Sequence, residues 1–202
     1  LREAGNRGWK LARVVNGVSP ARLLDSSGAE RRPVAARVLR NALAQVTLMR
    51  PDEHSKAACS TVADLLGLEG ARKAFGAMMS GLDICYASPG GHPLLGRRVP
   101  DLEVDLGHGT ISTYSLLHAA RPLLVNLANV PFPDLASWAD RIELVHGRTM
   151  GPWELPVIGT VAAPNAVLVR PDGYVAWVGE GDLAGLHDVL AEWFGVAERA
   201  AN

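Results

Sequence analysis

The stretch AVLVRPDGYVAWV, residues 166–178, decides the fold of the second half of the chain. Two apolar runs, 166–169 and 174–178, flank the four residues Arg170-Pro171-Asp172-Gly173. Proline presets the backbone for the first corner of a turn, and Asp-Gly is a strong signal for a tight reversal between strands. The sequence therefore predicts two antiparallel strands joined by a hairpin turn.

Strands and helices alternate on both sides of this hairpin. The predicted upstream elements are strands at 109–113, 121–127 and 142–145 and helices at 114–120 and 133–141. Downstream, Asp182 is the expected N-cap of a last helix over 183–194. The alternation by itself predicts a small α/β domain, and the elements in chain order, β-α-β-α-β-β-β-α, resemble a thioredoxin-like arrangement.

The first half of the chain has the periodicity of helices. Apolar residues recur at helical spacing, and we predict helices at 7–15, 19–24, 28–49, 61–66 and 69–79. The character of the sequence changes between Met79 and Pro100, where glycine and proline accumulate. We therefore expect a helical segment over residues 1–85 and a thioredoxin-like domain over 86–202.

Composition and charge exclude several classes of protein. The 202 residues carry a formal net charge of −1, which argues against a chain-wide surface for nucleic acid or anionic lipid. No apolar run approaches the roughly 20 residues that span a bilayer. Residues 1–6 lack the basic and apolar regions of a signal peptide. We therefore expect a cytoplasmic protein.

Motifs for self-contained catalysis are missing from the sequence. Thioredoxin-type redox chemistry needs a reactive thiolate after the first central strand, at 127–133, but the only cysteines are Cys59 and Cys85, which we expect to be buried or incidental. The six histidines lack metal-ligand spacing, so no metal site is expected. Neither a nucleophile elbow nor a glycine-rich phosphate loop occurs. The sequence therefore assigns no catalytic residue.

Two arginine pairs and five tryptophans have simpler interpretations. Arg31-Arg32 and Arg97-Arg98 are expected on solvated faces, paired with Glu30 and Asp101. The tryptophans are widely spaced, which favours packing in a core over a stacking platform.

Three parts of the chain resemble one enzyme family. They are NRGWKLA at 6–12, LD at 24–25 with ERRPVA at 30–35, and the pair HPLLGRRVPDL at 92–102 and VLVRPDGYVAW at 167–177. These segments resemble, in the same order, the C-terminal region of class A FAD-dependent aromatic-ring hydroxylases of the phenol and polyketide hydroxylase type. The last pair resembles that family's C-terminal thioredoxin-like domain, which lacks the cysteine pair of thioredoxin.

The resemblance implies a parent monooxygenase that reduces FAD with NAD(P)H and hydroxylates an activated aromatic ring. In such an enzyme the flavin performs the chemistry and the protein positions it. The family's dinucleotide-binding glycines lie upstream of the matching region and do not occur in this chain. We therefore expect no cofactor bound to this chain alone, and a structural, non-catalytic role without the flavin domain.

Residues near the flavin in the family are the most altered here. By resemblance, Glu3 and Asn6 are flavin-proximal; Glu3-Ala4 stands where the family has Asp-Ala, and Arg7 replaces a leucine. Two hypotheses remain open: the C-terminal part of a hydroxylase, or a free-standing remnant acting as a dimerisation or interaction module. Apolar stripes near Trp9 and Val38 favour either self-association or contact with an upstream flavin domain. A thioredoxin-type oxidoreductase is the third, least favoured hypothesis.

Overall fold

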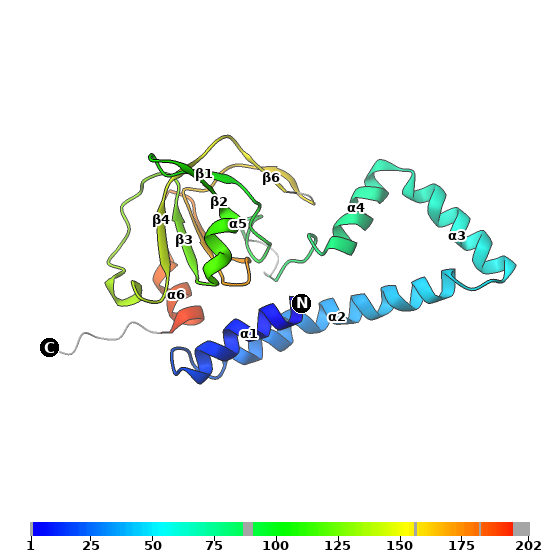
Figure 1. Ribbon diagram of the computed structural model, residues 1–202, viewed down its shortest axis with the longest axis horizontal. Helices are drawn as coiled ribbons and strands as arrows, with labels where there is room; N and C mark the ends of the chain where they lie inside the picture. The colour runs from blue at the N-terminus through cyan, green and yellow to red at the C-terminus, as the bar shows by residue number, and fades with distance from the viewer. Residues whose placement is uncertain (1, 87–90, 156, 182, 196–202) are drawn as a thin grey trace.

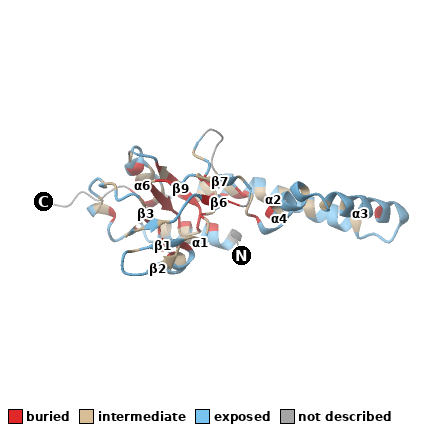
Figure 2. Ribbon diagram, turned by 90° about the horizontal axis from the view of Figure 1, so that it is seen from above, coloured by how far each residue is buried: buried red, intermediate tan, exposed pale blue. Residues whose placement is uncertain are grey.

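The first half of the computed structural model is helical, as expected (Figure 1). The structure describes residues 2–86, 91–155, 157–181 and 183–195. The four helices of this half are α1 (Arg2–Val15), α2 (Leu23–Leu48), α3 (Glu53–Leu66) and α4 (Glu69–Ser80). The first two pack against each other, whereas the far half of α2, α3 and α4 form an arm that extends from the body (Figures 1 and 2). No helix in the described ranges is both long and apolar enough to cross a membrane.

Two helix boundaries differ from the predictions. The helix expected at 28–49 is present within one continuous helix, α2, which begins at Leu23 and has Pro33 inside it, whereas residues 19–22 of the helix expected at 19–24 are not helical. Gly28 did not break the helix because a glycine lowers helix stability only by about 1 kcal/mol. The helix predicted at 61–66 begins earlier, at Glu53, because the Asp52 carboxylate accepts the Ser55 backbone N–H at 2.9 Å.

A four-stranded mixed sheet forms the centre of the second half and confirms the thioredoxin-like fold class. Its strands are β3 (Leu123–Asn126), β4 (Glu143–His146), β8 (Ala166–Val169) and β9 (Val175–Gly179), in the order β4-β3-β8-β9. Strands β3 and β4 are parallel, and the other neighbours are antiparallel. The predicted hairpin joins β8 to β9: the Gly173 N–H donates to the Arg170 carbonyl at 2.8 Å, and Gly173 takes a φ of +82° that favours glycine.

Other predicted elements of the second half are correct in part. The helix at 114–120 is present as α5 (Thr113–Leu116) followed by the 3₁₀ turn η1 (Leu117–Ala119). The helix predicted at 133–141 is wrong: only the 3₁₀ turn η2 (Ala136–Trp138) forms there. The Asp134 carboxylate accepts the Ala136 backbone N–H at 2.9 Å, and this local turn competes with the helix.

The last helix also starts later than expected. Helix α6 (Leu186–Phe194) begins directly after Gly185, which has a φ of +74°. The predicted cap, Asp182, lies outside the described residues.

Short strands at the periphery were not all expected. Strand β2 (Thr110–Ser112) was predicted, but its partners in a second sheet, β1 (Glu103–Asp105) and β5 (Arg148–Thr149), were not. A separate hairpin of β6 (Trp153–Leu155) and β7 (Gly159–Val161) was also missed. Elements of two or three residues carry too little period to be recognised in a sequence.

The central sheet has an apolar core on each face. Leu123, Val125, Val167 and Val169 point to one core, together with Trp153. The alternate residues of the same strands point to the other core, because side chains of a strand alternate between faces. That second core contains Trp138, Trp177 and α6, and Trp9 of α1 packs against it. The prediction that the tryptophans serve packing is confirmed, and α1 is attached to the sheet domain rather than separate from it (Figure 1).

Candidate functional site

Asn6, the described residue that the family resemblance places near a flavin, lies in a group of buried polar side chains. Helix α1 contributes Asn6 and Lys10, which share one helix face because they are four positions apart. Glu30 comes from α2, and Arg170 and Asp172 come from the β8–β9 turn. We call these five residues the buried charge cluster. Its ionic members are almost inaccessible: the exposed side-chain fractions are 0% for Lys10, 3% for Arg170, 5% for Asp172 and 8% for Glu30.

Glu30 is the centre of the hydrogen bonds in this cluster. Its two carboxylate oxygens accept from Nη1 and Nη2 of Arg170, at 2.6 and 3.1 Å. Its Oε2 atom also accepts from Lys10 Nζ at 2.8 Å and from Asn6 Nδ2 at 2.6 Å. One carboxylate therefore binds α1 and the hairpin turn to α2 at the same time.

Arg170 is paired on both sides of its guanidinium. Besides Glu30, it donates from Nε to Asp172 Oδ1 at 3.0 Å and from Nη2 to Asp172 Oδ2 at 2.6 Å. Such fork-to-fork geometry is the strongest form of this ion pair. Four aromatic rings surround the same guanidinium, with centroids 4.6 to 5.7 Å from its central carbon: Trp9, Tyr86, Tyr174 and Trp193.

The pKa shifts of Glu30 and Arg170 favour the ionised forms of these two residues. Burial would raise the pKa of Glu30, but hydrogen bonds from Arg170, Lys10 and Asn6 hold that pKa below its usual range. Burial disfavours the charged form of Arg170, yet its two carboxylate partners raise its pKa. Burial lowers the pKa of Lys10, partly opposed by the hydrogen bond to Glu30. Two cations face two anions, so the cluster is electrically balanced and holds the parts of the chain together.

The structure places the two predicted flavin-proximal residues differently. Asn6 is 1% exposed and donates to Glu30 and, at 3.3 Å, to Asp172, while its Oδ1 atom has no partner within the described ranges. Glu3 lies in α1, and its side chain is outside what the structure describes. The proximity of either residue to a flavin stays a prediction.

The expected solvated faces of the arginine pairs are wrong for two residues. Arg31 is 9% exposed and donates to the Tyr86 hydroxyl at 2.8 Å, while Glu30 pairs with other partners. Arg97 has a buried Nη1 atom with no partner in the described part of the chain. The spacing of charged residues could not show which face of α2 is buried and which is solvated, because the buried face also carries charged residues.

Sequence reasoning did not identify Lys10, Glu30, Arg170 or Asp172 as a group. A signal was nevertheless available, because all four lie inside the segments that carry the family resemblance. Charged residues in otherwise apolar motifs indicate buried ion pairs, since an unpaired charge would be expensive to bury.

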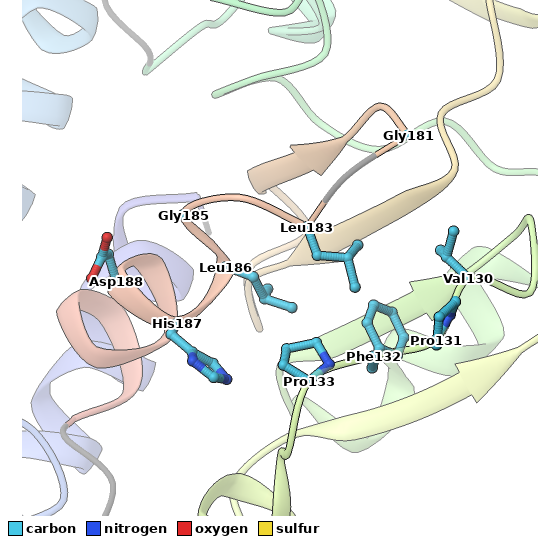
Figure 3. A pocket seen from close by; sticks show the side chains of 10 residues that line it. All are labelled: Val130, Pro131, Phe132, Pro133, Gly181, Leu183, Gly185, Leu186, His187 and Asp188. Carbon is cyan, nitrogen blue, oxygen red and sulfur yellow. The ribbon is translucent and has the colours of Figure 1, made fainter.

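A pocket of about 510 Å³ lies where a thioredoxin would carry its cysteines (Figure 3). One wall comes from the predicted segment after β3, with Phe132 and Pro133, and the other from the start of α6, with Leu183 and Leu186. In Figure 3 the leucines point toward Phe132 and Pro133, whereas the Asp188 carboxylate points away. Among the residues described as lining this pocket there is no thiol, so dithiol exchange cannot take place on this wall.

The two cysteines and His187 do not belong to the buried charge cluster. Cys59 and Cys85 are both exposed and free, so neither is the buried thiol that was one of our expectations. His187 stacks on Trp138, with ring centroids 5.4 Å apart. Across the described ranges, no group of three potential ligands could hold a metal ion.

Comparisons with known proteins relate the whole chain to one group of enzymes. A family model described as "Aromatic-ring hydroxylase, C-terminal" matches residues 92–197. A 12-dehydrotetracycline 5-monooxygenase/anhydrotetracycline 6-monooxygenase of Streptomyces rimosus is 40% identical over 199 residues, which cover 96% of this chain and 39% of that protein. A rifampicin monooxygenase of Streptomyces venezuelae is 36% identical over 197 residues, covering 98% of this chain and 38% of that enzyme.

Solved structures give the same relationship. The OxyS anhydrotetracycline hydroxylase from Streptomyces rimosus superposes with a TM-score of 0.86 at 38% identity, over 98% of this chain and 40% of that one. CabE, an aromatic hydroxylase from angucycline biosynthesis, gives a TM-score of 0.83 at 39% identity over 98% and 40%. The chain thus spans about two fifths of the length of the relatives it matches.

Proposed function

The chain belongs to the aromatic-ring hydroxylase family, whose C-terminal region it matches, and we propose that it is the C-terminal part of an FAD- and NAD(P)H-dependent aromatic-ring monooxygenase. In this proposal the chain is a structural body, and the flavin chemistry belongs to a preceding domain. The observation that carries the proposal is the match of nearly the whole chain to about two fifths of the anhydrotetracycline and rifampicin monooxygenases, together with the match to the aromatic-ring hydroxylase family model.

The residues of this chain do not fit FAD by themselves. A dinucleotide needs backbone N–H groups of a glycine-rich turn around its pyrophosphate, and the sequence has no such motif. Asn6, which resembles a flavin-proximal position, is buried and already donates to two carboxylates. We therefore derive no reaction step on this chain.

The buried charge cluster supports the structural role. It joins α1, α2 and the β8–β9 hairpin, so the helices nearest a preceding domain are fixed to the thioredoxin-like sheet. A buried pair of this kind specifies one arrangement because any displacement leaves a charge without its partner.

Flavin binding by the purified chain tests the proposal. FAD added to the chain should keep its free fluorescence and separate from the protein on gel filtration. NADPH oxidation in the presence of an aromatic acceptor should equal that of the same FAD solution without protein. A stable yellow complex that oxidises NADPH would refute the proposal.

A second candidate function is self-association through α1 and α2. We propose it because α2 exposes an apolar stripe on its arm, where Leu39 is 66%, Leu43 70% and Val46 61% exposed (Figure 2). Removing apolar surface from water is favourable by about 25 cal/mol per Å², and this stabilisation is missing while the stripe is exposed. A two-fold pairing of these helices would cover it.

Sedimentation equilibrium distinguishes this candidate from a monomer. The chain should form a dimer that dissociates on dilution, and Leu43→Glu should abolish the dimer because it places a charge in the apolar contact. Ala44→Glu, at an exposed position about 100° around the helix axis from Leu43, is the matched control and should leave the dimer unchanged. A wild-type monomer at high concentration would rule the candidate out.

A further inference from the structure

A smaller cavity lies in the second half of the chain, beside the β6–β7 hairpin. It has a volume of about 220 Å³, which is less than most drug-sized sites and suits a small molecule. The lining consists of Leu82, residues 97–101, Tyr114, residues 154–155 and residues 157–158. Leu82 follows α4, toward which the hairpin extends (Figure 1). No residue of α1 or α2 is part of this lining, so the cavity is separate from the helices nearest a preceding domain. We call it the Arg97 cavity.

Arg97 brings a buried donor without an acceptor to this cavity. Its Nη1 atom is closed to solvent and has no hydrogen-bond partner among the described residues. A charged donor in this state has lost its hydration and has gained no hydrogen bond in return, which costs free energy. Such a group is unusual in a native protein and calls for an explanation. An acceptor atom carried by a ligand would provide one.

The acidic residues that line the Arg97 cavity already have donors of their own. Asp101 Oδ1 accepts the Tyr114 backbone N–H at 3.1 Å, and Glu154 Oε1 accepts the Thr160 hydroxyl at 2.5 Å. Both acids are exposed, and neither is a partner of Arg97 Nη1. Water and salt screen exposed charges much more than buried ones. The uncompensated buried charge beside the cavity is therefore positive.

A second guanidinium adds to this positive charge. Arg98 also lines the cavity, and its Cζ atom lies 5.8 Å from the centroid of the Tyr174 ring. Stacking on an aromatic ring holds a guanidinium in place without supplying an anion for its N–H groups. The two neighbouring arginines therefore favour an anionic ligand.

The rest of the cavity wall is aliphatic and firmly placed. Its apolar members are Leu82, Val99, Pro100, Leu155, Val157 and Ile158. Val99 is 1% and Leu155 7% exposed, and both belong to one core of the central sheet. Aliphatic walls favour a molecule with a hydrocarbon part over a strongly hydrated inorganic ion.

We propose that the Arg97 cavity binds a small aliphatic carboxylate. The carboxylate group accepts from the guanidinium of Arg97, and the hydrocarbon part lies between Val99 and the β6–β7 hairpin. A planar guanidinium matches a carboxylate in both geometry and charge. Because Nη1 is enclosed, the Arg97 side chain turns toward the ligand on binding. This inference goes beyond the proposed function and is independent of it, since a chain that binds no flavin can still bind a carboxylate here.

The carboxylate 3-methylbutanoate and its neutral isostere 3-methylbutanamide test the ligand class by NMR on the full chain. The backbone amides of residues 97–99 and 157–158 should shift saturably with the carboxylate. The amide should bind at least about fivefold more weakly, because it cannot form the ion pair. Equal binding of the two compounds, or no saturable shift with the carboxylate, would overturn the proposal. Acetate that binds as tightly as 3-methylbutanoate would show that the aliphatic wall contributes nothing and would overturn the ligand class.

Arg97→Met and Arg148→Met form a matched pair that locates the site. Arg97→Met keeps an unbranched apolar side chain but removes the guanidinium, and it should weaken 3-methylbutanoate binding by about fivefold or more. Arg148 is exposed on β5 and is not part of the cavity lining, so Arg148→Met should leave binding unchanged. Equal weakening in both variants would show a general effect of charge and would contradict the site.

The midpoint of urea denaturation distinguishes a ligand-binding role of Arg97 from a structural one. Without ligand, Arg97→Met should unfold at the same urea concentration as the wild type or at a higher one, because the buried Nη1 atom has no acceptor to lose. Saturating 3-methylbutanoate should raise the midpoint of the wild type but not that of Arg97→Met. A lower midpoint of Arg97→Met without ligand would show that Arg97 stabilises the chain itself, and it would overturn the assignment.

Discussion

Glu30→Ala is expected to lower the free energy of unfolding by about 3 to 5 kcal/mol, the cost of leaving a buried charge without its partner. The substitution removes one of the two carboxylates that pair with Arg170 and the carboxylate that accepts from Lys10, and these two cationic side chains are 3% and 0% exposed. Neither cation can turn to water without opening the contact between α1 and the hairpin. Urea denaturation followed by tryptophan fluorescence measures the loss.

A matched control shows whether the loss of stability in Glu30→Ala depends on the burial of the ion pair or would follow from the loss of any ion pair. Glu53→Ala removes the partner of Lys56, but these side chains are 88% and 61% exposed, and we expect a change below about 0.5 kcal/mol. A Glu30→Ala loss as small as that of Glu53→Ala would show that the cluster contributes no structural specificity.

The lowered pKa of Glu30 also makes the free energy of unfolding depend on pH. The folded-state pKa of Glu30 lies below its unfolded value of 4.5, so its stabilising contribution is complete above that pH. This contribution should be lost as the pH falls through the lower folded-state pKa. Glu30→Gln, which cannot ionise, should lack that part of the acid loss. An unchanged acid profile in Glu30→Gln would exclude Glu30 as its source.

Phe194→Ala is expected to cost about 3 to 5 kcal/mol and to release α1 from the sheet domain. Phe194 is 0% exposed at the end of α6, and its ring centroid lies 6.1 Å from that of Trp9. The Arg13 guanidinium covers the same ring at 5.1 Å, and Arg13 Nη2 donates to the Phe194 carbonyl at 3.2 Å. Burial in this contact and, to a smaller extent, the charge of Arg141 lower the pKa of Arg13 to about 10.

Phe75→Ala is the matched control, because it makes the same substitution at a position on the arm. Phe75 is 40% exposed, so its truncation should cost less than about 1 kcal/mol. Denaturation and the near-UV circular dichroism of the tryptophans should separate the two variants. Comparable losses for both phenylalanines would contradict the division into a packed body and an exposed arm.

Local signals predicted the centre of the sheet well. The Arg170-Pro171-Asp172-Gly173 turn and the runs at 123–125 and 166–169 lie where the sequence placed them, because turn chemistry and continuous apolar runs act over a few residues. The helix expected at 133–141 is absent although its apolar residues imitate a helical period, because the Asp134 side chain binds the Ala136 backbone N–H and a local 3₁₀ turn forms instead. The early start of α3 was missed because a single capping aspartate, Asp52, sets it.

Most of the candidate sites could not be predicted from local patterns. Glu30 has neighbouring arginines in the sequence, which suggested an ordinary solvated face, yet its partners Arg170 and Lys10 are 140 and 20 positions away. Arg7 of α1 and Arg32 of α2 line the same hollow although 25 positions separate them in the sequence. Contacts between elements depend on how the elements dock, and periodicity within one element carries no record of that.

The sequence by itself determined the positions of the four central strands along the chain, the helical character of the first half, the lack of a cysteine at residues 127–133, and the resemblance to aromatic-ring hydroxylases. Only the tertiary structure decided that α1 and α2 are fastened to the β8–β9 hairpin, and which face of α2 is turned inward. The physical reason is that hydrogen-bonded turns and apolar periods are local, whereas a buried charge is tolerable only beside a partner that the folded chain brings to it.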